Sequence, residues 1–404
     1  MRKRDFYEQR EQEPQADELA RARRKKKRRR FFQKVLALLL VGAAVWGLLF
    51  LRKDIARLDF GMRFSDLLAS YSTGNGYPAE LPAGKVVDLA PLGKDMVLLT
   101  DTMLMMYNSN GKCTGSYEHG YTAPISLTSG DRVLTFDRGG KRFRVDSRSS
   151  ALFDGETDYT IATADIASSG HVAVVSGAKY YHSSITVYDA DYDEIYIRET
   201  ADLITDVCLE NKGGGMAAAS VDAVDGRLDS TVTFFSFSQE EPVAETVLED
   251  ELILSMAFVG RGSETLQVIT DRQALLLDRQ GRITAQNSFD DLFVNRFVNS
   301  KNGGIYLLLD QLGDGNRLQL VALDRELNPV GQLPLENRVQ DMRLGDRYLC
   351  LFAAGDITCY SLDLSEQFTA QLENCYHYQP AGQYLYGITA DTIELLKPET
   401  AAAS

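Results

Sequence analysis

The sequence has few of the residues from which enzyme sites are usually recognised. Its four histidines share no motif with a serine or cysteine, and no G-x-S-x-G elbow occurs, so no nucleophile-and-base motif is recognisable. The five cysteines are too few for a disulfide scaffold, and no pair has C-x-x-C metal-site spacing. We therefore predict no catalytic residue, no cofactor and no metal site, and expect that the protein is not an enzyme.

Long helical periods are also absent beyond residue 85, where short apolar runs alternate with Gly, Asp, Asn and Ser. This pattern indicates an all-β fold. The runs recur as a unit of about 41 residues, whose third strand ends in a polar turn. Its eight copies begin at Met105, Phe143, Ile185, Val232, Ala274, Leu318, Ile357 and Ile393.

A period of ~40–45 residues with four short strands per unit predicts a β-propeller. The eight copies predict eight four-stranded blades, with seven as the alternative if one copy is irregular. The last copy leaves no room for a fourth strand, so we expect a strand within Gly76–Ala83 to close the ring. The predicted propeller covers residues 76–399, followed by a flexible C-terminus at 400–404.

The N-terminal part predicts a membrane anchor. Residues 1–30 hold 13 Lys and Arg against 6 Asp and Glu, and the chain from Val35 to Leu51 carries no charge. We predict a basic cytoplasmic tail (1–30), a transmembrane helix (31–51) and an extracytoplasmic remainder in the cell membrane. A cleaved secretory signal is the alternative, but its apolar region is usually only ~7–15 residues long.

A linker at 52–75 follows the anchor and is predicted to contain a short amphipathic helix. Its apolar residues Ile55, Leu58, Phe64, Leu67 and Leu68 have near-helical spacing. The helix either lies on the membrane surface or packs on the propeller.

The whole layout resembles an uncharacterised family of membrane-anchored propeller proteins from Gram-positive anaerobic bacteria. It consists of the basic tail, one span, a short helix, and the segment GYPAELPAGKVVDLAPLGKDMVLLTDTMLMMYNSNGK opening the propeller. The resemblance implies a quinoprotein-like or WD40-like shape but supplies no functional residues. No Trp follows Trp46, so the docking tryptophan of quinoprotein dehydrogenases and the Trp-Asp ending of WD40 repeats are both missing.

The candidate binding rim comes from stretched connections between second and third strands. They are predicted at Gly177–Ser184, Asp222–Ser230 and Gln311–Asn316, and loops on a rigid scaffold commonly carry recognition residues. The candidate residues in them are Tyr180, Tyr181, His182, Asp225, Arg227, Asp314 and Asn316. The Tyr180 cluster is a binding patch if exposed and core packing if buried.

Two further patterns each have two interpretations. Cys350 and Cys359 are predicted to face each other across a hairpin, either as a disulfide or as two buried thiols. Asp189, Asp191 and Asp193 resemble the start of a calcium loop, but Glu194 and Thr200 stand where its Gly and Glu should be. An acidic hairpin is the simpler interpretation.

Together these features predict a membrane-tethered binding or assembly module for an extracytoplasmic protein or other envelope component. After residue 30 the chain holds 30 Lys and Arg against 51 Asp and Glu, so nucleic acid is disfavoured and a cationic partner is favoured. The alternatives are a ligand sensor, or a glycosidase-like or dehydrogenase-like enzyme with an unrecognised site in the propeller channel.

Overall fold

The computed structural model describes residues 60–400 apart from 261, 301, 312, 314, 316, 371 and 373. The predicted basic tail, the predicted transmembrane helix and the start of the linker lie outside the described residues. Among those described, no helix is long and apolar enough to cross a membrane. The chain divides between Arg63 and Phe64, and the fold below is that of the unit from Phe64 onward.

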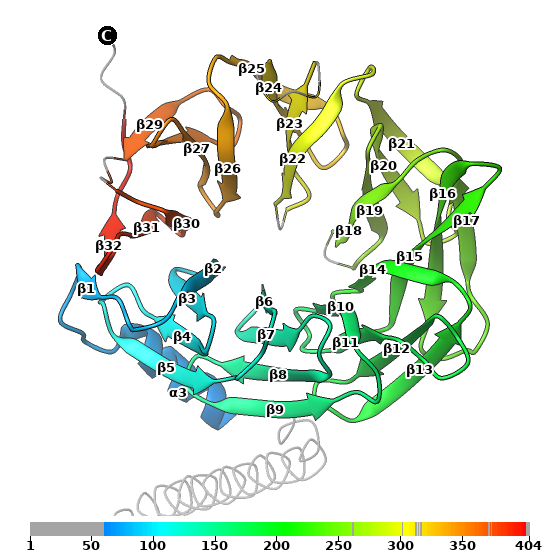
Figure 1. Cartoon of the computed structure of the whole chain (residues 1–404), viewed down its shortest axis with the longest axis horizontal. Helices are drawn as coiled ribbons and strands as arrows, with labels where there is room; N and C mark the ends of the chain where they lie inside the picture. Colours follow the sequence, from blue (N-terminus) through cyan, green and yellow to red (C-terminus); the bar gives the residue numbers. More distant parts are fainter. Residues whose placement is uncertain are drawn as a thin grey trace, which may run out of the picture. The chain divides into compact units, whose positions relative to one another are not determined.

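This unit consists of eight antiparallel sheets arranged as the blades of a ring (Figure 1). Blade 1 contains β2 (Val86–Leu92), β3 (Asp95–Thr100), β4 (Met103–Tyr107) and β5 (Cys113–Glu118), and blade 2 contains β6 (Pro124–Ser129), β7 (Arg132–Asp137), β8 (Arg142–Ser147) and β9 (Ala151–Glu156). Blade 3 contains β10 (Ile161–Ile166), β11 (Val172–Ser176), β12 (Ser183–Tyr188) and β13 (Glu194–Thr200). Blade 4 contains β14 (Leu203–Leu209), β15 (Gly215–Val224), β16 (Arg227–Ser236) and β17 (Ala244–Leu248).

Blades 5 to 8 complete the ring and confirm eight blades rather than seven. Blade 5 contains β18 (Ile253–Val259), β19 (Thr265–Thr270), β20 (Gln273–Asp278) and β21 (Ile283–Ser288), and blade 6 contains β22 (Phe293–Asn299), β23 (Ile305–Asp310), β24 (Leu318–Leu323) and β25 (Pro329–Leu335). Blade 7 contains β26 (Val339–Leu344), β27 (Tyr348–Ala353), β28 (Asp356–Ser361) and β29 (Gln367–Ala370). Blade 8 contains β30 (His377–Ala381), β31 (Tyr384–Ile388) and β32 (Thr392–Leu396).

The eighth blade takes its fourth strand from the start of the propeller. Strand β1 (Ala79–Glu80) pairs with β32 through Ala79 with Ile393 and Glu80 with Thr392, within the segment predicted to close the ring. A short terminal strand, β33 (Glu399–Thr400), adds to β29 as a fifth strand of blade 7. Both ends of the propeller are therefore held by sheet pairing.

The polar turn of the predicted repeat has a physical cause. The side chain of Asp189 accepts hydrogen bonds from the backbone NH groups of Asp191 and Asp193, and Asp278 and Asp324 cap the turns of their own blades in the same way. These Asx caps close the hairpin between third and fourth strands. The calcium-like pattern at Asp189 is therefore such a turn.

Each blade runs outward from an inner strand, so its connections emerge on two opposite rims. The connections between second and third strands, and those between blades, emerge on one rim, here called the BC rim. The other connections emerge on the AB rim. The second strands are the most buried, as in β3 and β23, whereas the outermost strands alternate between exposed and half-buried residues.

The predicted linker helix is present as α3 (Phe60–Tyr71) and packs on the AB rim of blades 1 and 2. Ser70 donates a hydrogen bond to Asp95, and Asn108 donates to the carbonyls of Ala69 and Ser72. The contact is thus made by polar groups.

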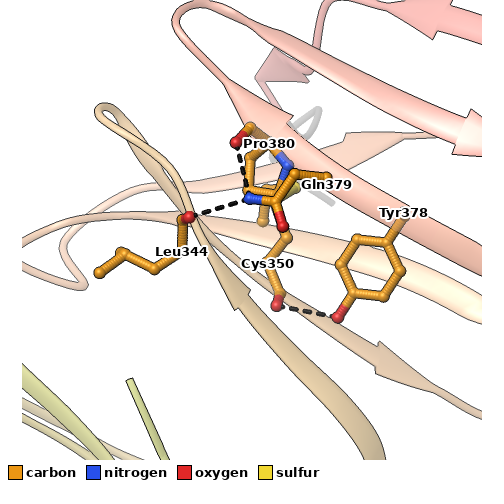
Figure 2. The surroundings of a disulfide bond; sticks show 6 residues. Leu344, Cys350, Tyr378, Gln379 and Pro380 are labelled. Atoms are coloured by element: carbon orange, nitrogen blue, oxygen red, sulfur yellow. Dashed lines mark hydrogen bonds between the residues drawn. A yellow bond between two sulfur atoms is a disulfide. The ribbon is translucent and has the colours of Figure 1, made fainter. Parts of the chain in front are cut away.

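Cys350 and Cys359 are paired across β27 and β28 and are joined by a disulfide. Blade 8 docks beside it, where Tyr378 donates a 3.1 Å hydrogen bond to the Cys350 carbonyl (Figure 2). Gln379 donates to the carbonyl of Leu344 at 3.1 Å, and Figure 2 shows these groups gathered next to the cross-link. Cys113, Cys208 and Cys375 are free.

Candidate binding surface

The first predicted connection forms an exposed aromatic tip on blade 3. Tyr180 is 81% exposed, and Tyr181 and His182 are exposed beside it, so the cluster is a surface patch rather than core packing. Lys179 places its ammonium 5.0 Å from the centre of the Tyr180 ring. The connection joins β11 to β12 and therefore lies on the BC rim.

The second connection differs from the loop predicted at Asp222–Ser230. Strands β15 and β16 extend through this segment, and their pairing continues to Val224 with Arg227. Only Asp225 and Gly226 form the turn, both with positive φ, as a two-residue type I′ hairpin requires. The Asp-Gly signal for this turn was available in the sequence.

The extended hairpin forms an arm that stands clear of the blade. Every residue from 222 to 228 is exposed, including Asp225 and Arg227 at the tip. Val224 and Leu228 are apolar members of the arm, and Leu228 is 52% exposed. Such an arm offers two faces of side chains to a partner.

The third connection joins β23 to β24 on blade 6. Asp314 and Asn316 lie outside the described residues, so their predicted roles stay predictions. Within the connection, the backbone NH of Gly315 donates to the carboxylate of Asp310. Phe293 lies against Gly313, since a Cβ built on that glycine would be 3.4 Å from the ring.

Residues that were not predicted extend this surface. Four exposed aromatic or apolar side chains lie on the same rim, at connections between blades or at the start of inner strands: Tyr159, Leu203, Phe293 and Tyr376. Leu203 and Phe293 open inner strands, and an apolar residue at such a place looks like a core position in the sequence, which is why these two were missed. The BC rim thus carries exposed apolar groups on blades 3, 4 and 6 and at the entry to blade 8.

The central channel is the second candidate site. A cavity of about 700 Å³ is lined by inner strands of blades 1, 5, 6, 7 and 8. Six inner strands carry a bulge at the same position, and the residue after it is polar in every case: Asp88, Thr163, Asp206, Ser255, Arg296 and Asp341.

An ionic cluster occupies one wall of this cavity. Arg343 contacts the carboxylates of Asp88 and Asp341, each at 2.9 Å, and so connects blade 7 to blade 1. Burial and the Arg343 charge lower the pKa of His377, although the two carboxylates oppose the shift. The lowered pKa favours the neutral form of this histidine, so the cation of the cluster is Arg343, which pairs with both carboxylates.

A pair of carboxylates lies on blades 3 and 4. Asp165 accepts a 2.8 Å hydrogen bond from the NH of Leu209, and Asp206 accepts one of 3.2 Å from Met256, so each contacts the inner strand of the next blade. Burial raises the pKa of Asp165. Burial, followed by the charge of Asp165, raises the pKa of Asp206 to about 7. Their bonds serve to join blades.

No metal site emerges from the described part of the chain, which contains no group of three His, Cys, Asp or Glu side chains that could hold an ion. The carboxylates of the inner strands instead contact an arginine or backbone NH groups of other blades. The BC rim, by contrast, carries exposed aromatic and apolar side chains on several blades.

Comparison with known proteins supports the fold. A family model described as a family of unknown function (DUF5711) matches residues 69–397. No curated protein matches the sequence. The chain is similar in structure to the C-terminal WD40 domain of Sif2, with a TM-score of 0.55, 8% identity, and coverage of 80% of this chain and 100% of that one.

Two other solved propellers give similar values. One is Chaetomium thermophilum Sqt1 bound to the N-terminus of the ribosomal protein L10, with a TM-score of 0.53, 11% identity, and coverage of 79% of this chain and 98% of that one. The other is BamB from Moraxella catarrhalis, with a TM-score of 0.50, 11% identity, and the same two coverages. At these identities the likeness shows the propeller fold alone.

Proposed function

Because the chain belongs to DUF5711, a family of unknown function, we propose its role from its own surface. It is a membrane-tethered binding module whose BC rim docks an extracytoplasmic protein. The single observation that carries this proposal is the set of exposed apolar groups on that rim, above all Tyr180 and the arm bearing Val224 and Leu228.

Apolar side chains exposed together on one face are a feature of protein interaction sites. Tyrosine is especially suited to such sites, because its ring buries a large apolar area and its hydroxyl can still pair. Tyr180 and Leu228 lie on adjacent blades of a rigid ring, which holds them in fixed relation before binding.

The location outside the membrane rests on two observations. The excess of Lys and Arg in residues 1–30 directly precedes the uncharged run, which favours a cytoplasmic N-terminus. The disulfide between Cys350 and Cys359 agrees with this orientation, because disulfides persist mainly in oxidising compartments. Protease added outside the membrane should therefore degrade the propeller.

The partner's chemistry follows from the charge balance. Acidic residues outnumber basic ones by 51 to 30 after residue 30, so a partner with a cationic rim around an apolar centre fits best. The solved structure of Sqt1 holds the N-terminus of the ribosomal protein L10, so one propeller of similar fold binds a protein segment.

The test uses the full chain in cells that naturally produce it, with a photo-crosslinking amino acid at Tyr180 or Leu228. A control carries the same amino acid at Val247, which is 59% exposed on the outermost strand of blade 4. We expect one discrete crosslinked protein from Tyr180 and Leu228 and none from Val247. Equal labelling at all three positions, or none at the rim, would refute the proposal.

A further inference from the structure

The helix α3 is mounted with its polar face inward. Asp66 is 4% exposed and accepts hydrogen bonds from the hydroxyls of Ser147 and Ser149, and Ser70 is buried against Asp95. These contacts anchor the helix to the turns of blades 1 and 2. A surface helix normally does the opposite and buries its apolar face.

The apolar residues of α3 face away from the propeller as a continuous stripe. Phe64, Leu67, Leu68 and Tyr71 are 61%, 55%, 56% and 67% exposed. Their spacing of three, four and seven residues places them on one side of the helix. Four large apolar groups in a row, left uncovered on a helix that is otherwise firmly docked, indicate a second surface that covers them.

We propose that the stripe lies in the membrane interface, so that the propeller rests on the bilayer through its AB rim. This inference rests on the membrane anchoring proposed above. The apolar run ends at Leu51, and only eight residues separate it from the start of α3 at Phe60. Eight residues span at most about 28 Å. The chain itself therefore limits how far the stripe can lie from the bilayer surface.

The chemistry of the stripe fits lipid better than a soluble partner. Tyrosine and phenylalanine on the apolar side of an amphipathic helix suit the boundary between headgroups and acyl chains. Lys94 lies 3.9 Å above the centre of the Tyr71 ring and brings a cation to the end of the stripe. An ammonium at that depth attracts anionic headgroups.

The placement also fixes which rim faces outward. Helix α3 contacts Asp95, Asn108 and Ser147, all at connections of the AB rim. If that rim lies on the membrane, the BC rim with Tyr180 and Leu228 points away from it. The surface proposed to bind a partner is then the one most accessible from outside.

The test uses the full chain in vesicles of phosphatidylcholine and phosphatidylglycerol, with brominated lipids as quenchers. Trp46 is the only tryptophan and lies in the apolar run, so its quenching reports on the anchor. In a Trp46→Phe background, Leu68→Trp reports on the stripe and Tyr180→Trp on the BC rim. Leu68 and Tyr180 are both exposed, so the fold should tolerate a tryptophan at either position.

We expect Leu68→Trp to lose most of its emission to lipids brominated near the headgroups, and Tyr180→Trp to lose none. If brominated lipids quenched Trp46 in the native chain but did not quench the tryptophan of Leu68→Trp, the inference would be overturned and the membrane anchor would stand. An unquenched Trp46 would overturn both. If the emission wavelength of Leu68→Trp changed with protein concentration but not with added lipid, the stripe would contact a second copy of the chain. This outcome would also refute membrane contact.

Discussion

Ser149 donates a 2.6 Å hydrogen bond from its hydroxyl to the carboxylate of Asp66, although the two residues are 83 positions apart. Ser147 donates to the same carboxylate oxygen at 3.1 Å. This pair of bonds sets the rotation of α3 on blade 2. It therefore determines which face of the helix is exposed. A polar contact thereby determines the placement of an apolar surface.

Asp66→Ala should loosen this attachment. It removes the acceptor that two serine hydroxyls share, and losing hydrogen bonds to a buried charged group costs about 1–3 kcal/mol. Limited proteolysis between α3 and β1 in detergent should therefore become faster, with a lower urea midpoint. Leu68→Ala is the matched control on the same helix, and its exposed side chain should change stability by less than about 0.5 kcal/mol. Equal effects of the two changes would contradict the docking described above.

Removing the disulfide should destabilise the propeller. Cys350 and Cys359 are separated by 9 positions, and closing a loop of this size is worth about 2–3 kcal/mol in the chain-entropy account. Urea unfolding of the Cys350→Ala, Cys359→Ala double variant should show that loss and should no longer respond to reductant. Thiol titration of the denatured, unreduced protein should count the 3 free cysteines; a count of all 5 would show that the bridge does not form in the protein.

Much of the fold could be predicted because the turn chemistry repeats. A polar residue after the third strand marked the blades in the sequence. At Asp189, Asp278 and Asp324 this residue caps the turn, which explains why the signal persists although the repeats are otherwise dissimilar. The channel could not be predicted in this way. Whether Asp206 or Thr205 contacts the next blade depends on a bulge between Ile204 and Asp206, which leaves no mark in the sequence.

The same limit applied to surfaces. Periodicity placed Phe64, Leu67 and Leu68 on one helical face, but an amphipathic pattern does not say which face is buried. Only the contacts of Asp66 and Ser70 show that the polar face is inward.

Asp206→Asn should change how stability depends on pH. The pKa of Asp206 is about 7 in the folded protein, above its usual value of 3.8, because burial and then Asp165 disfavour its charge. The unfolded chain gives up this proton near pH 4, whereas the folded protein keeps it to about pH 7. Raising the pH through this window therefore destabilises the native protein, by at most about 1.4 kcal/mol per pH unit.

Asparagine carries no such proton and keeps an oxygen that can accept from Met256. The variant should therefore match the native protein near pH 4 and be more stable than it at pH 8, as measured by urea unfolding at both values. A pH profile of Asp206→Asn parallel to that of the native protein would show that this carboxylate does not hold its proton near neutrality.

Shortening the arm of blade 4 should abolish partner binding without harming the ring. Deleting Ala223, Val224, Arg227 and Leu228 removes two facing pairs and leaves Asp225-Gly226 as the turn between Asp222 and Asp229. Antiparallel pairs alternate between two hydrogen-bonding types, so removing an even number preserves the alternation that the type I′ turn needs. The deleted residues are exposed, so the melting temperature should not fall.

Crosslinking from Tyr180 to the partner should be lost in the shortened protein. The control Val247→Ser changes an exposed apolar residue on the outer strand of the same blade and should leave this crosslinking unchanged. If crosslinking persisted in the shortened protein, the partner would not need the arm. It would then bind through another part of the BC rim, which the intact ring still presents.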